Sequence, residues 1–116
     1  MGRLSTHVLD TAHGKPAAGL TIDLYYLGGE SRQHSSPQHI ASFTTNADGR
    51  TDAPLLAAEE MVTGVFELVF HVGEYFGLEP RFLNQVPVRF RITYATQNYH
   101  FPLLVSPDAY STYRGS

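Results

Sequence analysis

The chain has 116 residues and a formal net charge of −3, and 16% of its residues are charged, against about 25% in an average protein. The absence of cysteine excludes disulfides and thiolate chemistry, and the absence of a Lys/Arg cluster argues against a nucleic-acid partner. No apolar run approaches the roughly 20 residues of a membrane span, and the N-terminus lacks the apolar core of a secretory signal. We therefore expect a cytoplasmic protein with no membrane contact, folded as one domain over residues 1–116.

Strand-sized segments separated by turns follow one another along the chain. The expected strands are 4–10, 20–27, 39–45, a short extended piece from Arg50 to Pro54, 64–72, 86–94, 100–105 and 109–114. Between them, turns or loops are expected at 13–19, 28–38 and 46–49, and a loop with one helical turn at 55–61. Many short strands at such spacing are typical of an antiparallel β-sandwich.

Alternation of side chains indicates which faces are buried. In the first strand Ser5, His7 and Leu9 share one face, opposite Leu4, Thr6 and Val8. The segment 86–94 is the cleanest amphipathic strand, and its expected inward residues are Val88, Phe90, Ile92 and Tyr94.

Three residues have side chains suited to catalysis. His7 and His100 each lie in a strand, where a histidine is compatible with a hydrogen-bonded structural role or with proton transfer near neutral pH. Arg50 follows a turn, where a solvated surface charge and an anion-binding guanidinium are the two alternatives. Residue types alone leave these alternatives open.

The C-terminal segment does not look like a frayed tail. It ends in Tyr113, Arg114, Gly115 and Ser116, so two bulky side chains, a hydroxyl group and the α-carboxylate come together at the terminus. An interface plug and an ordered edge strand fit this composition about equally well.

Four histidines lie outside these segments. His34 and His39 are five residues apart, but no third ligand is placed by spacing, so we expect no metal site there. His34 and His39 are read as surface histidines, His13 is assigned no role, and His71 is expected to pair with Glu67 at a surface or an interface.

Four motifs carry a family resemblance. They are Leu-Ser-Thr-His-Val-Leu-Asp at 4–10, Thr-Asn-Ala-Asp-Gly-Arg at 45–50, His-Phe-Pro-Leu-Leu at 100–104 and Tyr-Arg-Gly-Ser at 113–116. With these motifs in this order, the chain resembles the 5-hydroxyisourate hydrolases, the enzyme branch of the transthyretin-like family. The resemblance covers nearly the whole chain.

The resemblance implies a fold, a reaction and an assembly. The fold would be an all-β, transthyretin-like antiparallel sandwich of two four-stranded sheets, with one short helix at 73–80. The reaction would be the hydrolysis of 5-hydroxyisourate to 2-oxo-4-hydroxy-4-carboxy-5-ureidoimidazoline in urate (purine) degradation, without a cofactor or a metal. The assembly would be a homotetramer, a dimer of dimers, with the sites in a channel between dimers.

The resemblance also assigns roles to residues. His7, Arg50, His100 and Ser116 would be catalytic, and these four together with Tyr113 and Arg114 would bind the substrate. The two histidines would activate a water and Arg50 would stabilise the oxyanion, with the choice of the general base left open. A Ser116 nucleophile is the weaker alternative, since nothing in the sequence places a base beside it.

Two other classes of protein share such a sandwich. A transthyretin-type carrier would bind small aromatic ligands in the central channel, but the carrier branch lacks the first-strand histidine and the terminal Tyr-Arg-Gly-Ser. An immunoglobulin-like interaction module would leave His7, Arg50, His100 and the C-terminal segment without a common explanation.

Overall fold

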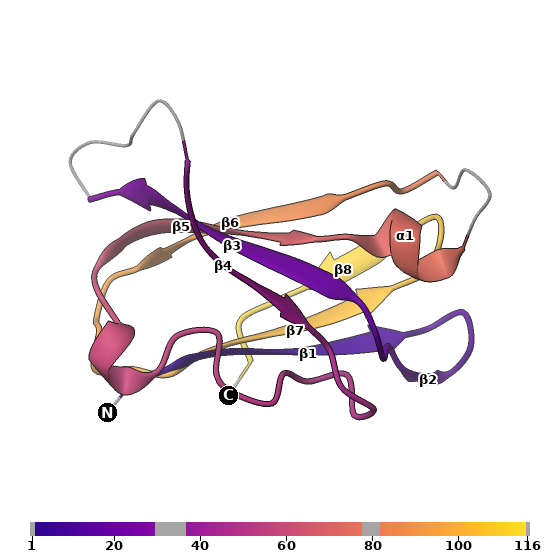
Figure 1. Ribbon diagram of the computed structural model, residues 1–116, viewed down its shortest axis with the longest axis horizontal. Helices are drawn as coiled ribbons and strands as arrows, with labels where there is room; N and C mark the ends of the chain where they lie inside the picture. Colours follow the sequence, from indigo (N-terminus) through magenta and orange to yellow (C-terminus); the bar gives the residue numbers. More distant parts are fainter. Residues whose placement is uncertain (1, 30–36, 78–81, 116) are drawn as a thin grey trace.

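The computed structural model describes residues 2–29, 37–77 and 82–115, which form two four-stranded sheets packed face to face (Figure 1). The strands are β1 (Leu4–Asp10), β2 (Lys15–Pro16), β3 (Thr21–Gly28), β4 (Gln38–Thr44), β5 (Gly64–Phe70), β6 (Val86–Ile92), β7 (Tyr99–Val105) and β8 (Tyr110–Thr112). Two short helical segments complete the fold, a 3-10 turn at Ala58–Glu60 and the helix α1 at Val72–Phe76. The expected fold class is confirmed.

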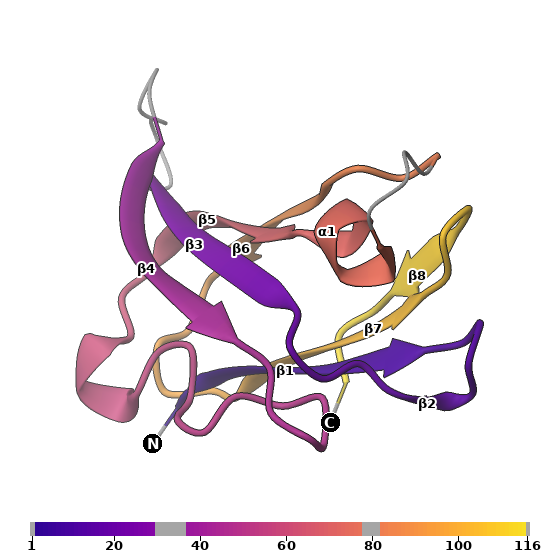
Figure 2. The ribbon, with the colours of Figure 1, turned by 45° about the vertical axis from the view of Figure 1, so that its right-hand side comes forward.

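The order of strands is β2-β1-β7-β8 in the first sheet and β4-β3-β5-β6 in the second sheet. Five of the pairs between described strands are antiparallel, whereas β1 and β7 run parallel and lie side by side in both views (Figures 1 and 2). The parallel pair joins residues about 95 positions apart, with Ser5 opposite His100. This pairing brings two of the sequence motifs together.

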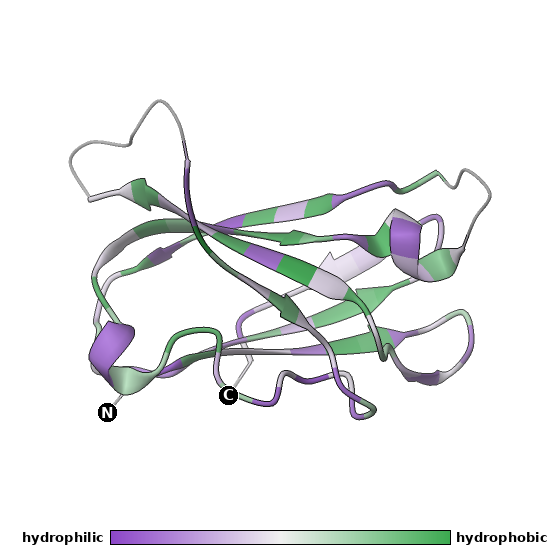
Figure 3. Ribbon diagram, viewed as in Figure 1, coloured by the Kyte–Doolittle hydropathy of each residue, from purple (hydrophilic) through white to green (hydrophobic). Residues whose placement is uncertain are grey.

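The core lies between the two sheets, where the inward residues of alternating strands meet. In β1 every second residue from Leu4 to Asp10 is buried, and Ser5, His7 and Leu9 are partly exposed, as the alternation predicts. Figure 3 shows the same alternation of hydrophobic and hydrophilic residues along the strands. The largest fully buried side chains come from both sheets and include Phe66, Phe70, Leu24 and Leu103.

Buried polar groups in this core are paired. The fully buried carboxylate of Asp10 accepts hydrogen bonds from the Tyr75 hydroxyl and the His13 ring, both at 2.7 Å. These bonds attach α1 and the β1–β2 turn to the end of β1. Because an unpaired buried carboxylate would be strongly destabilising, the three side chains act as one structural unit.

Several boundaries differ from the sequence-based expectations. The expected extended piece at 50–54 does not form a strand. Instead, the two-residue strand β2 lies inside the segment 13–19 that was expected to be a turn. The strand expected over 64–72 ends at Phe70 because α1 begins at Val72. Tyr94 was expected to face inward but is 60% exposed, because β6 ends at Ile92 and the alternation of the strand does not continue to Tyr94.

Other predictions extend beyond the part of the chain that the structure describes. His34 and residues 30–36 of the polar loop, residues 78–80 of the expected helix, and Ser116 all lie outside it. Within the described residues, no helix is long and apolar enough to cross a membrane.

Candidate active site

A cavity of about 400 Å³ opens on the outward face of the first sheet, where β1 and β7 are adjacent. It is lined by Arg3, Ser5, Thr6, Arg50, Thr51, Asp52, Ala53, Pro54, Asn98 and His100. Its size is in the range of small-molecule binding sites. Two guanidinium groups and one carboxylate line it, so the site favours a ligand with carbonyl oxygens or negative charge.

His100 reaches this cavity because it alternates with inward residues of β7. Phe101 and Leu103 are buried in the core, so His100 projects to the opposite face. Its Nδ1 lies 2.8 Å from the hydroxyl oxygen of Ser5, its register partner on β1. The ring is therefore held by one nitrogen.

Burial lowers the pKa of His100, and the positive charges of Arg50, His7 and Arg3 lower it further. At neutral pH the imidazole is therefore unprotonated and can accept a proton. A neutral histidine can act as a general base, and a guanidinium beside it can stabilise the negative charge that develops on the substrate.

Arg50 is placed by a tight turn over residues 46–50. The side-chain oxygen of Asn46 accepts hydrogen bonds from the backbone N–H groups of Asp48 (2.9 Å) and Arg50 (3.2 Å). The Asn46 backbone N–H donates to the Arg50 carbonyl at 2.7 Å, and its side-chain amide donates to Asp52 at 3.0 Å. Asn46 thus connects both ends of the turn.

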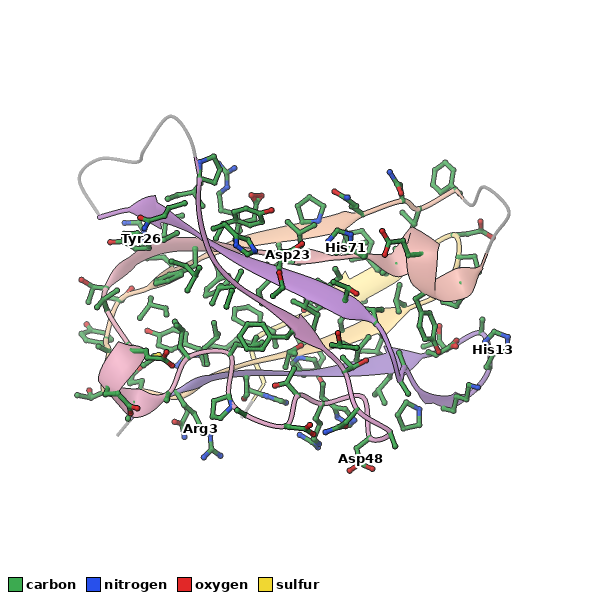
Figure 4. The ribbon with its side chains drawn as sticks, in the orientation of Figure 1. Arg3, His13, Asp23, Tyr26, Asp48 and His71 are labelled. Atoms are coloured by element: carbon green, nitrogen blue, oxygen red, sulfur yellow. The ribbon has the colours of Figure 1, made fainter. Side chains whose placement is uncertain are left out.

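Gly49 fixes this turn against β1. Its φ is +76°, and a Cβ at this position would lie 2.3 Å from the Val8 carbonyl oxygen. The Val8 N–H donates to the Gly49 carbonyl at 2.8 Å, and three backbone hydrogen bonds between Leu4 and Leu55–Leu56 fix the far end of the segment. The chain from Arg50 to Pro54 is therefore held along β1, where it forms one wall of the cavity. Arg3 and Asp48 project on this side of the molecule in Figure 4.

The other predicted site residues that the structure describes, His7, Tyr113 and Arg114, do not line the cavity. His7 is on the same face of β1 two residues beyond Ser5, close enough for its charge to affect His100, but it is not a lining residue. Arg114 stacks over Tyr99 at 4.1 Å and donates to the Asn98 carbonyl at 2.8 Å, and Tyr113 is 58% exposed. The roles of these residues remain predictions, as does that of Ser116 outside the described residues.

Sequence reasoning missed three contributors to the site. Ser5 and Arg3 line the cavity and Asn46 organises the turn, yet none was singled out. The alternation that places Ser5 and His7 on one face was a usable signal for Ser5, whereas the contacts of Asn46 depend on the folded turn.

The surface histidines also differ from expectation in part. His71 does not pair with Glu67: its Nε2 lies 2.7 Å from Asp23, and its side chain is 15% exposed. Asp23 and His71 lie together on the second sheet in Figure 4. Glu67 instead pairs with Arg89, while His13 and His39 are surface residues bound to Asp10 and Asp23. Among residues 2–29, 37–77 and 82–115, no group of three or more His, Asp or Glu side chains is arranged to hold a metal ion.

The fold and the cavity together define a β-sandwich with a small polar site for acid–base chemistry on the outer face of one sheet. Residues 4–115 match the model of the HIUase/Transthyretin family. The chain belongs to this family.

Individual relatives agree with this assignment. The chain is 54% identical to 5-hydroxyisourate hydrolase 2 of Rhizobium meliloti, over 99% of this chain and 97% of that protein. The solved 5-hydroxyisourate hydrolase of Klebsiella pneumoniae is 32% identical with a TM-score of 0.81, over the full length of both chains. Transthyretin from Sparus aurata superimposes with a TM-score of 0.85 at 22% identity, over 97% of this chain and 96% of that chain, which shows the shared fold.

Proposed function

We propose that this chain hydrolyses 5-hydroxyisourate, an intermediate of urate degradation. The observation that carries the proposal is the placement of His100 and Arg50 on one cavity, where burial and the nearby Arg50 lower the pKa of His100. Full-length relatives with hydrolase names, at 54% and 32% identity, support the enzyme over the carrier.

The mechanism is addition of water to the carbonyl of a cyclic amide followed by cleavage of the ring C–N bond, which opens the ring. The Nε2 atom of His100 takes a proton from water as the water oxygen bonds to the ring carbonyl carbon. The carbonyl oxygen becomes an oxyanion, which Arg50 stabilises with its fixed positive charge. The C–N bond then breaks, the imidazolium returns its proton to the leaving nitrogen, and the carboxylic acid that is formed releases its proton to solvent to give a carboxylate.

His7 and the C-terminal residues complete the site in this proposal. His7 helps to position the water from the same face of β1, and Tyr113, Arg114 and Ser116 bind the substrate, as the family resemblance implies. The hydrogen bond from Arg114 to the Asn98 carbonyl supports this arrangement, because Asn98 lines the cavity.

The experiment is a coupled ultraviolet assay in which urate oxidase forms 5-hydroxyisourate in the cuvette. Its decay is followed at neutral pH, with chelator, in the presence and absence of the protein. Faster decay is expected with the protein. Unchanged decay in the presence of folded protein would overturn the hydrolase proposal and favour a carrier, to be tested with small aromatic ligands.

We also propose that the chain forms a homotetramer, a dimer of dimers. Strands β6 and β8 are edge strands of their sheets. In or near them, the large side chains of Tyr94, Tyr110 and Tyr113 are exposed. Unpaired edges and exposed aromatic groups of this kind favour association between copies. Light scattering should give a mass four times the 12.9 kDa of one chain, and a monomer at micromolar concentration would contradict the proposal.

A further inference from the structure

Ser5 is the residue that holds the ring of His100. The two side chains come from paired positions on β1 and β7, and the Ser5 Oγ lies 2.8 Å from the His100 Nδ1. Both residues line the cavity. Among the described residues no other hydrogen bond to the His100 ring is found, so this contact leaves Nε2 as the nitrogen available to substrate.

We propose that Ser5 is a positioning residue that accepts a hydrogen bond from Nδ1–H of His100 and so keeps the reactive lone pair on Nε2. The inference rests on the proposed function, because it assigns to Ser5 the task of preparing His100 as the base. Ser5 itself does not react in this account.

The direction of the hydrogen bond follows from the chemistry of the ring. A serine hydroxyl can donate or accept, but a neutral imidazole carries its proton on one nitrogen only. If Ser5 donated to Nδ1, the proton would be on Nε2, and Nε2 could not accept a proton from water. If Ser5 accepts from Nδ1–H, Nε2 is free to act as a base.

The accepting direction also fits both protonation states of His100. Once Nε2 has taken the proton of water, both ring nitrogens carry hydrogen, and only an acceptor can remain bonded to Nδ1. Ser5 can therefore keep the same hydrogen bond through proton uptake and release. A hydrogen bond to the charged form partly offsets the unfavourable charges of Arg50, His7 and Arg3 around the ring.

Position 5 allows a closely matched test. Thr and Val have nearly the same shape and both suit a strand, so Ser5→Thr and Ser5→Val differ mainly in the hydroxyl group. Ser5 is partly exposed on the outward face, so either side chain can be accommodated without entering the core. Thermal unfolding of both variants checks that they fold alike.

The expected kinetic result is that Ser5→Thr retains most of the wild-type kcat/KM, whereas Ser5→Val loses about 10-fold or more, the range for a hydrogen bond to a charged group. The pH profile of kcat/KM should also change in Ser5→Val, since the protonated form of His100 loses its acceptor and its pKa falls. Equal rates and equal pH profiles for the Thr and Val variants would overturn the inference.

A second measurement needs no substrate. Nitrogen-15 NMR of histidine-labelled protein reports which ring nitrogen of His100 carries the proton. We expect the Nδ1–H form in the wild type and in Ser5→Thr, and a shift toward Nε2–H in Ser5→Val. An Nε2–H form in the wild type would overturn the inference even in a fully active enzyme, whereas failure of wild-type protein to hydrolyse 5-hydroxyisourate would overturn the proposed function separately.

Discussion

The backbone N–H of Gly115 donates a hydrogen bond to the carbonyl oxygen of His100, with 2.7 Å between the two atoms. The C-terminal segment therefore continues alongside β7 past the end of β8 and reaches the residue that we propose as the base. This backbone contact connects the terminal motif to the site. We therefore expect loss of the segment to reduce catalysis more than it reduces the stability of the fold.

Deletion of residues 113–116 should abolish hydrolysis and leave a folded sandwich. Tyr113 and Arg114 are exposed, so their removal sacrifices little buried apolar area. The decay assay and circular dichroism of the purified truncated protein measure the two properties separately. If no folded protein can be recovered, the segment is primarily structural and the proposed binding role is wrong.

Gly115→Ala should reduce activity through contact with the catalytic ring. A Cβ on Gly115 would lie 3.0 Å from Cδ2 of His100 and 3.1 Å from Cγ of Pro102, so the ring must move by a few tenths of an ångström. We expect kcat/KM to fall about 10-fold with little change in melting temperature, since misplaced catalytic groups are costly. Gly29→Ala is the control, because among the described residues no atom beyond its chain neighbours lies within 4 Å of the added Cβ. Equal activity of the two variants would contradict the close approach at Gly115.

The pH dependence of kcat/KM should show an acid limb below pH 6.5, the ordinary histidine pKa. Burial and the charges of Arg50, His7 and Arg3 lower the pKa of His100, so the base stays neutral until the pH falls below that value. Arg3→Gln removes one of these charges and should raise the His100 pKa, moving the acid limb to higher pH. A limb that moves to lower pH in Arg3→Gln would be inconsistent with His100 as the base.

Asp23 should stabilise the fold at neutral pH but not in acid. Its burial opposes ionisation, but hydrogen bonds from Ser42, His71 and His39 outweigh that effect and lower the pKa of Asp23 to about 2, from 3.8. The stabilisation is therefore complete above about pH 4 and is lost as the pH falls toward 2. It amounts to about 2 kcal/mol.

Urea unfolding of Asp23→Asn at several pH values tests this prediction. The difference in the free energy of unfolding between Asp23→Asn and the wild type should be largest at pH 7 and should disappear near pH 2. Asp108→Asn, in an exposed loop, is the control and should change little at either pH. A destabilisation by Asp23→Asn that stays constant from pH 7 to pH 2 would rule out the ionised carboxylate as its cause.

The strands could be predicted from the sequence because they depend on the alternation of neighbouring residues, and the motifs could be recognised because each is a short run of consecutive residues. Alternation in β1 correctly placed Ser5 and His7 on the outward face. The motifs pointed to Arg50 and His100, and both residues line the cavity, while their catalytic roles stay a proposal. The β2 strand was missed because two residues carry no periodic signal.

Long-range pairing accounts for what the sequence could not predict. The Ser5 to His100 hydrogen bond depends on the parallel register of β1 and β7, which joins residues 95 positions apart. In the same way, His71 bonds to Asp23 rather than Glu67. Asp23 lies on β3, which pairs with β5, and the His71 side chain just after the end of β5 reaches over to it. Local patterns contain no information on such partners.

The most direct test of the account compares two histidine variants in the 5-hydroxyisourate decay assay. His100→Asn removes the proposed base, whereas His39→Asn makes the same chemical change at an exposed histidine on the other sheet. We predict that wild-type protein and His39→Asn accelerate decay alike and that His100→Asn is at least about 100-fold slower, the contribution expected of a general base. Near-normal turnover by folded His100→Asn would contradict the central claim that His100 activates the water.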